Sequence, residues 1–267
     1  MSERKKQKEL KQPDALQRAG LEATSWIEGK EKYVVGLVVA VLVVFGGIAV
    51  ADYFKDRRQR QAQQELGAAL EPVTRPVSEG TTPPDTSGDE KPFASQQEKD
   101  QAIIDSLTKF RAAHEGTRSA ATAALPLAEA YYREGKYDEA AKAFEEFLNR
   151  SPKDDPLRAV ALEGQGYAYE AKGDLDKAYA SYDALSKLET QQFLDGMGQF
   201  HKARVLILQG KKEEAAKALA EIPGQFPNSA AARMATERMN LLASQGVKVP
   251  APVPPKSATD AGIAQGS

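Results

Sequence analysis

The sequence predicts an all-α protein in which a single N-terminal transmembrane helix precedes an α-solenoid of helix–turn–helix repeats. Two observations lead to this fold class. Residues 33–51 form a run of 19 residues without a charge, nearly all of them apolar. Residues 98–245 have apolar residues at helical spacing and show a similar glycine-containing segment three times, at intervals of 38 and 37 residues.

The apolar run is long enough to cross a membrane. At about 1.5 Å per residue it reaches about 28 Å, close to the ~30 Å hydrocarbon core of a bilayer. Trp26 and Tyr33 lie before its apolar part, and Tyr53 and Phe54 follow it, where aromatic rings favour the headgroup region. A cleaved signal peptide is the alternative, because residues 49–51 have the small-x-small form of a cleavage site. The long charged tail before the run favours an uncleaved anchor.

Charge gives the orientation of this helix only weakly. Three Lys or Arg residues lie within about 20 residues before the run and four after it. The whole tail of residues 1–32 contains eight Lys or Arg and six Asp or Glu. Because the tail is short and long domains are translocated largely regardless of charge, we expect the N-terminus inside and the C-terminus outside.

Composition excludes several kinds of site and partner. The 36 Lys and Arg residues are balanced by 38 Asp and Glu residues, which argues against a nucleic-acid partner. The absence of cysteine rules out thiolate zinc sites and cysteine nucleophiles, and His114 and His201 are the only histidines. No phosphate-binding loop or pair of catalytic carboxylates is visible. The sequence therefore predicts a protein that is not an enzyme, with no cofactor, metal site or small-molecule substrate.

Changes in composition divide the chain into six segments. Residues 71–97 and 246–267 are rich in Pro, Gly and polar residues and predict a flexible loop and a disordered tail. The helices at 52–70 and 98–114 are expected to form a degenerate first helix pair. The expected segments are a charged tail (1–32), a transmembrane helix (33–51), a juxtamembrane helix (52–70), the loop (71–97), the repeat domain (98–245) and the tail (246–267).

The repeats resemble the tetratricopeptide repeat, whose pattern places small, aromatic and turn residues at fixed intervals and ends with proline. The second repeat has Thr190 in place of that proline, and the third replaces the aromatic residues with leucine. The matching positions are Ala128, Tyr131, Gly135, Ala140, Phe144 and Pro152; Gly166, Tyr169, Gly173, Ala178 and Tyr182; and Ala203, Leu206, Gly210, Ala215, Leu219 and Pro227.

The pattern has a physical basis. The first small residue of each repeat lets two helices approach closely, and the glycine ends the first helix in a left-handed conformation. Asp138 and Asp176 are expected in the first turn of a second helix, where negative charge suits the helix dipole. Asn228 or Ser229 is expected to cap a final helix that closes the solenoid.

The resemblance also implies a protein-binding groove lined by the first helix of each repeat. Aromatic residues with interleaved charges make a plausible peptide-binding surface. The alternative is that some of these side chains pack against the next repeat. The expected groove residues are Glu129, Tyr132, Arg133, Glu163, Tyr167, Glu170, Phe200 and Arg204.

The order of segments resembles the bacterial ancillary Sec translocon subunit family, single-span inner-membrane proteins with a periplasmic tetratricopeptide-repeat domain. The long tail before the span, the Pro-rich loop and the C-terminal extension depart from that pattern. The resemblance implies a cytoplasmic N-terminus and a non-catalytic scaffold that binds translocon subunits, periplasmic chaperones or emerging clients. The alternative is a periplasmic repeat protein of envelope biogenesis or cell-division coordination, and a cleaved N-terminal segment would favour it.

Overall fold

The computed structural model describes residues 30–78, 91–188 and 195–254. The chain forms two compact units, Met1–Arg58 and Gln59–Ser267. Within the described ranges the regular structure is helical, and the one β-type feature is an isolated bridge between Val77 and Phe93. The helices are α3 (Glu31–Ala69), α4 (Glu71–Thr74), α5 (Gln96–Ala113), α6 (Arg118–Thr122), α7 (Ala124–Arg133), α8 (Tyr137–Arg150), α9 (Leu157–Lys172), α10 (Leu175–Ser186), α11 (Met197–Leu208), α12 (Lys212–Gln225) and α13 (Ala230–Ser244).

The first unit contains the apolar part of α3. Its most apolar 18-residue stretch has a mean hydropathy of 2.5, and none of that stretch is buried within the protein. Large side chains such as Leu42 and Phe45 are exposed. By length and composition, α3 is the one helix in the described part of the chain that can cross a membrane. Most of the charged tail, residues 1–29, lies outside the described residues.

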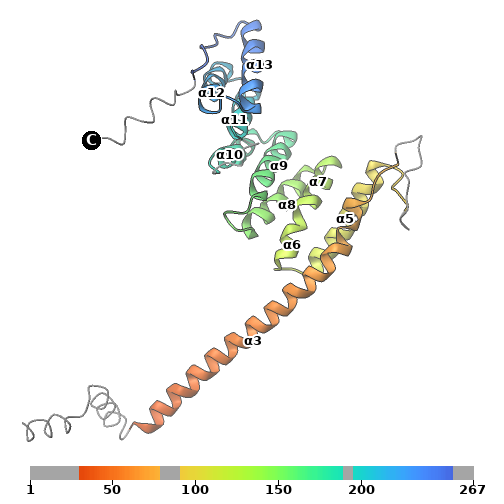
Figure 1. Ribbon diagram of the computed structural model, residues 1–267, viewed down its shortest axis with the longest axis vertical. Helices are drawn as coiled ribbons and strands as arrows, with labels where there is room; N and C mark the ends of the chain where they lie inside the picture. Colours follow the sequence, from red (N-terminus) through yellow and green to blue (C-terminus); the bar gives the residue numbers. More distant parts are fainter. Residues whose placement is uncertain (1–29, 79–90, 189–194, 255–267) are drawn as a thin grey trace, which may run out of the picture. The chain divides into compact units, whose positions relative to one another are not determined.

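The second unit begins with the last turns of α3, which pack along α5 (Figure 1). Ala62 and Ala69 share a buried cluster with Ile103 and Leu107, and the hydroxyl of Ser106 donates a 2.8 Å hydrogen bond to the carbonyl of Ala69. Ser95 caps α5 by accepting a hydrogen bond from the backbone of Glu98. These contacts hold the end of α3 against α5.

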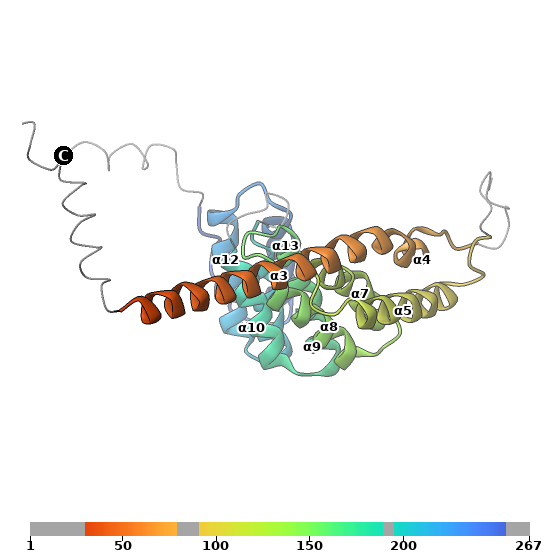
Figure 2. The ribbon, with the colours of Figure 1, turned by 90° about the horizontal axis from the view of Figure 1, so that it is seen from below.

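The remaining helices stack in chain order from α7 to α13, each against the next (Figures 1 and 2). The first repeat consists of α6 and α7 followed by α8, the second of α9 and α10, and the third of α11 and α12. Ser229 caps α13, because its hydroxyl accepts a hydrogen bond from the backbone of Ala232. The predicted all-α solenoid of helix pairs is confirmed.

The small and turn residues act as the pattern predicts. A Cβ atom on Gly166 would lie 2.3 Å from the ring of Tyr182, so only glycine fits this contact between α9 and α10. The turn glycines Gly135, Gly173 and Gly210 have φ angles of 73°, 86° and 78°, a region that costs glycine little. One close contact was not predicted: a Cβ on Gly164 would lie 2.4 Å from the ring of Phe144.

The prediction of a flexible loop over residues 71–97 is wrong at both ends. Residues 71–74 form α4, with Pro72 buried, and α5 already begins at Gln96. Between them the N–H of Phe93 donates to the carbonyl of Pro76 at 3.0 Å. The Phe93 ring is buried beneath the guanidinium of Arg75, at 4.6 Å, and this contact fixes the strand-like segments. Residues 79–90 lie outside the described part.

The prediction of a disordered tail from residue 246 is also wrong for its first nine residues. Val247 and Val249 pack against the buried cluster of α11, α12 and α13. The N–H of Val253 donates a 2.8 Å hydrogen bond to the carbonyl of Ala220. Gly224 makes room for this contact, since a Cβ there would lie 2.9 Å from Val253. Residues 255–267, like Thr190, lie outside the described residues.

Candidate protein-binding groove

The predicted groove residues lie on the first helices of three successive repeats. Helix α7 carries Glu129, Tyr132 and Arg133; α9 carries Glu163, Tyr167 and Glu170; and α11 carries Phe200 and Arg204. The amphipathic spacing that places these residues near one another is i, i+3, i+4 and i+7.

Five of these residues line one pocket between α7 and α9. The pocket has a volume of about 220 Å³. Its floor is apolar, formed by the buried ring of Phe144 together with Val160 and Gly164. Tyr132, which is 37% exposed, contributes one aromatic wall. The lining residues from the predicted groove are Glu129, Tyr132, Arg133, Glu163 and Tyr167.

A buried aspartate holds Arg133 in this pocket. The guanidinium of Arg133 donates to both carboxylate oxygens of Asp100, at 2.7 to 3.0 Å. The side chain of Asp100 is only 2% exposed, and Gln96 donates a further hydrogen bond to it at 2.9 Å. The bidentate geometry is the strong form of an Arg–carboxylate contact. Helix α5 therefore orients a groove residue on α7.

The second set of contacts joins α9 to α11 through His201. Its Nε2 lies 2.9 Å from the carboxylate of Glu163 and 3.3 Å from the hydroxyl of Tyr167. The hydrogen bond from His201 lowers the pKa of Glu163 despite its burial. An ionised carboxylate only accepts hydrogen bonds, so Nε2 carries the hydrogen. The other ring nitrogen, Nδ1, is buried and has no hydrogen-bond partner among the described residues.

Arg204 completes this network. It donates to Glu170 at 2.7 Å and to the hydroxyl of Tyr182 at 3.1 Å. Its guanidinium also lies 5.1 Å from the centre of the Tyr167 ring, within cation–π range. Burial raises the pKa of Tyr167 to about 12 and raises that of Tyr182 further, so both phenols are neutral at pH 7.

Comparison with protein-family models now identifies the repeats. A model described as a tetratricopeptide repeat-like domain matches residues 25–163, and one described as a tetratricopeptide repeat matches residues 198–229. The first match covers more than half of the chain. The chain belongs to the tetratricopeptide repeat-like domain family. Such repeats are typically non-catalytic and mediate protein–protein interactions.

Solved structures with tetratricopeptide-like repeats also align with the chain. Two are nearly identical repeats of a putative kinesin light chain from Podosopora anserina, one of them a single-residue variant. Both are 17% identical to this chain, and each alignment covers 73% of this chain and 93% of the other, with TM-scores of 0.40 and 0.39. The search of curated proteins found no match.

Phe200 does not lie on the groove surface, contrary to expectation. It is 4% exposed and belongs to the buried cluster of the third repeat and α13. Its neighbour His201 faces Tyr167 instead, with the ring centres 5.3 Å apart. Adjacent residues on a helix point about 100° apart, so Phe200 packs towards α12 and α13 while His201, which is also buried, packs against α9. The alternative that some predicted groove residues pack between repeats therefore applies to Phe200.

Asp100, His201 and Tyr182 are the site residues that sequence reasoning missed. Each contacts a groove residue on a neighbouring helix. A usable signal exists in the spacing: Arg133 follows Asp100 by 33 residues, and both His201 and Arg204 follow their partners Tyr167 and Glu170 by 34. Residues about one repeat apart with complementary chemistry are candidates for such contacts.

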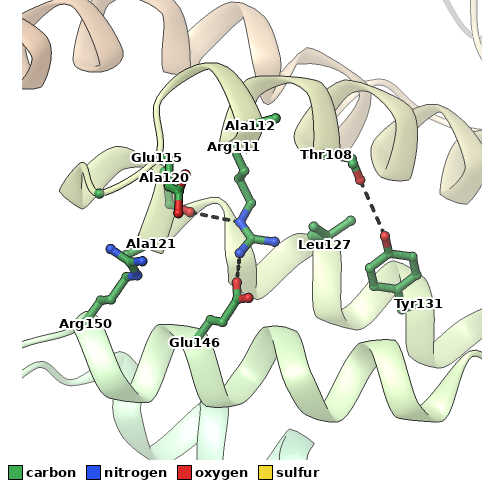
Figure 3. Close-up of a pocket in the computed structure, with 11 residues that line it drawn as sticks. Thr108, Arg111, Ala112, Glu115, Ala120, Ala121, Leu127, Tyr131, Glu146 and Arg150 are labelled. Atoms are coloured by element: carbon green, nitrogen blue, oxygen red, sulfur yellow. Dashed lines mark hydrogen bonds and ion pairs between the residues drawn. The ribbon is translucent and has the colours of Figure 1, made fainter.

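A second pocket, of about 260 Å³, lies among α5, α6, α7 and α8 (Figure 3). Arg111 projects into it, forms an ion pair with Glu146 and donates to the carbonyl of Ala120 at 3.3 Å. Burial lowers the pKa of this guanidinium. Because its donors already face protein acceptors, the role of Arg111 is to join α5, α6 and α8. The described residues contain no group of three or more His, Asp or Glu placed to hold a metal ion.

Proposed function

We propose that the protein is a membrane-anchored, non-catalytic scaffold that binds extended segments of other proteins along the face formed by α7, α9 and α11. The single observation that carries this proposal is the pocket between α7 and α9, where an apolar floor meets two tyrosines and charged side chains. Aromatic side chains supply contact area at low entropic cost, and charged groups around them select the partner.

Two arginines on this face are held by contacts within the protein. Arg133 is fixed by Asp100, and Arg204 is fixed by Glu170 and Tyr182. Side chains that are already ordered lose little freedom when a partner binds. An extended partner must still be ordered, so we expect modest affinity, in the micromolar range.

The second part of the proposal is the cellular location of the protein. We propose that α3 anchors the protein in a bacterial inner membrane, with a cytoplasmic N-terminus and a periplasmic repeat domain. There it would act beside the Sec translocon, together with periplasmic chaperones or emerging clients. The order of segments and the apolar, unburied first part of α3 support this setting.

Site-specific photo-crosslinking in native membranes tests the proposal. A photoreactive residue replaces Val160 on the pocket floor of the full-length protein, and a matched control replaces Lys142, which is exposed on α8. The proposal expects polypeptide adducts from position 160 that exceed those from position 142, with translocon subunits, chaperones or exported clients among them. Equal labelling from both positions would reject the groove. Adducts confined to cell-division or outer-membrane assembly proteins would favour the alternative setting.

A further inference from the structure

The pocket between α7 and α9 has an excess of negative charge. Two carboxylates, those of Glu129 and Glu163, line it directly, and Asp100 binds its one guanidinium, that of Arg133. Three carboxylates therefore face a single arginine. His201, behind Glu163, adds at most one positive charge. Negative charge is in excess in either protonation state of His201.

The two lining carboxylates are accessible to a ligand, whereas that of Asp100 is not. Asp100 is enclosed and directs its oxygens at Arg133, so this pair is internally neutral. The side chain of Glu129 is 52% exposed, and its oxygen lies 3.8 Å from Arg133, beyond a strong hydrogen bond. Glu163 is partly exposed and is held ionised by His201. A bound ligand therefore meets Glu129 and Glu163 as available acceptors.

The rest of the pocket suits the stem of a long side chain. Phe144, Val160 and Gly164 form an apolar floor, and the rings of Tyr132 and Tyr167 line the pocket beside the carboxylates. Lysine and arginine bury an aliphatic stem along apolar surface while their charged heads stay near polar groups. A cation is also attracted to the face of a tyrosine ring.

The same chemistry already occurs inside the protein, on the neighbouring helix. The guanidinium of Arg204 lies 5.1 Å from the Tyr167 ring centre and 5.9 Å from that of Tyr182, and it pairs with Glu170. Tyrosine faces and a carboxylate thus accommodate a guanidinium in this fold. The pocket lining offers the same residue types, and Arg133 is the one basic side chain among its lining residues.

We propose that this pocket binds one lysine or arginine side chain of an extended polypeptide, and that the groove therefore selects basic segments. This inference rests on the proposed function, because it names the chemistry of the partner that the groove would take. It excludes an acidic side chain at this position, which would meet Glu129 and Glu163 as like charges.

The test measures the affinity of the full-length protein, in detergent, for labelled peptides by fluorescence anisotropy. The peptides share a sequence of serine, asparagine and leucine and differ at one central position, which is lysine, norleucine or glutamate. Norleucine keeps the aliphatic stem and removes the charge. We expect the lysine peptide to bind at least about fivefold more tightly than the norleucine peptide, with a preference that falls at high salt.

Two variants locate the effect. Glu129→Gln removes one of the two lining carboxylates and is expected to lower the ratio of lysine-peptide affinity to norleucine-peptide affinity. Glu145→Gln, an exposed carboxylate on α8, is the matched control and should leave both unchanged. Thermal unfolding shows that each variant is folded.

The outcomes separate the inference from the proposed function. Equal binding of all three peptides would overturn the basic preference and leave a peptide-binding groove. A lysine preference of parental size in Glu129→Gln would also overturn it, because residues outside the pocket would then recognise the charge. Absence of binding by every peptide, together with no adducts from position 160, would overturn the proposed function and this inference with it.

Discussion

Glu170 and Arg204, 34 residues apart on α9 and α11, form an ion pair of 2.7 Å between the first helices of two successive repeats. Asp100 and Arg133 make the corresponding contact between α5 and α7. In a solenoid each unit contacts mainly its neighbours, so contacts of this kind determine how firmly units stack. The face formed by α7, α9 and α11 thus also carries ion pairs between successive units.

Replacement of Arg204 by methionine is expected to destabilise the protein by about 1–3 kcal/mol. The change removes the guanidinium that donates to Glu170 and to the buried hydroxyl of Tyr182, and leaves Glu170 only its hydrogen bond with Tyr182. Urea unfolding of the full-length protein in detergent measures the difference. The control is Lys177→Gln, which removes an exposed ion pair with Asp174 and should leave the midpoint unchanged. Equal midpoints for both variants would show that the Arg204 contacts do not hold the repeats together.

Two glycine-to-alanine changes should have opposite effects on stability. Gly166→Ala places a methyl group 2.3 Å from the Tyr182 ring, so overpacking should cost about 1–3 kcal/mol. Gly67→Ala lies in α3 with nothing within 4 Å of the new Cβ. It should stabilise by about 0.5–1 kcal/mol, because alanine is the better helix former. Thermal unfolding compares the two, and a stable Gly166→Ala would mean that α9 and α10 are packed differently.

Glu163 makes the stability of the folded protein depend on pH in the acid range. The hydrogen bond from His201 holds the pKa of this carboxyl below its ordinary value in the folded protein. A carboxyl group whose pKa is lower in the folded than in the unfolded protein stabilises the fold at pH values above its unfolded-state pKa. This stabilisation is lost as the pH falls through its folded-state pKa. Tyr167 stays neutral and Arg204 stays charged in that range.

The unfolding free energy of the parent and of Glu163→Gln, followed from pH 7 downward, tests this dependence. The parent should be the more stable protein at pH 7, and the difference should shrink as the pH falls through the lowered pKa of Glu163. A constant difference over the whole range would contradict the contribution of an ionised Glu163.

The native protein is expected to keep residues 1–51. The charged tail and the 19-residue apolar run favour an uncleaved anchor. N-terminal sequencing of the protein extracted from native membranes measures this directly. A mature chain that begins at Asp52 would reject the anchor and favour a soluble periplasmic protein.

The sequence predicts the solenoid well because its signals are local. The glycines at 135, 173 and 210 need a left-handed turn whatever surrounds them, and the helix periodicity follows from burial of one face. Phe200 could not be placed in this way, because Phe200 and His201 are both buried and only the packing of α12 and α13 decides that Phe200 joins their apolar cluster.

The C-terminal segment shows a different limit. Proline-rich composition indicated disorder. In the structure, however, the N–H of Val253 donates to the carbonyl of Ala220, and Gly224 has no side chain to obstruct this contact. Similarly, aspartate is usually an exposed residue. Asp100 is buried and binds Arg133 only because α5 lies beside α7. Such contacts depend on the tertiary arrangement of residues far apart in sequence.

Calorimetry on a variant of the pocket between α7 and α9 tests whether this pocket is the binding surface. Isothermal titration calorimetry compares the parent with the double variant Tyr132→Ala, Tyr167→Ala, using full-length protein and a purified client polypeptide identified by crosslinking. The account predicts that the double variant stays folded and binds at least about tenfold more weakly, because both tyrosines line the pocket. A folded double variant with parental affinity would contradict it and would direct attention to the outer helices or to α3.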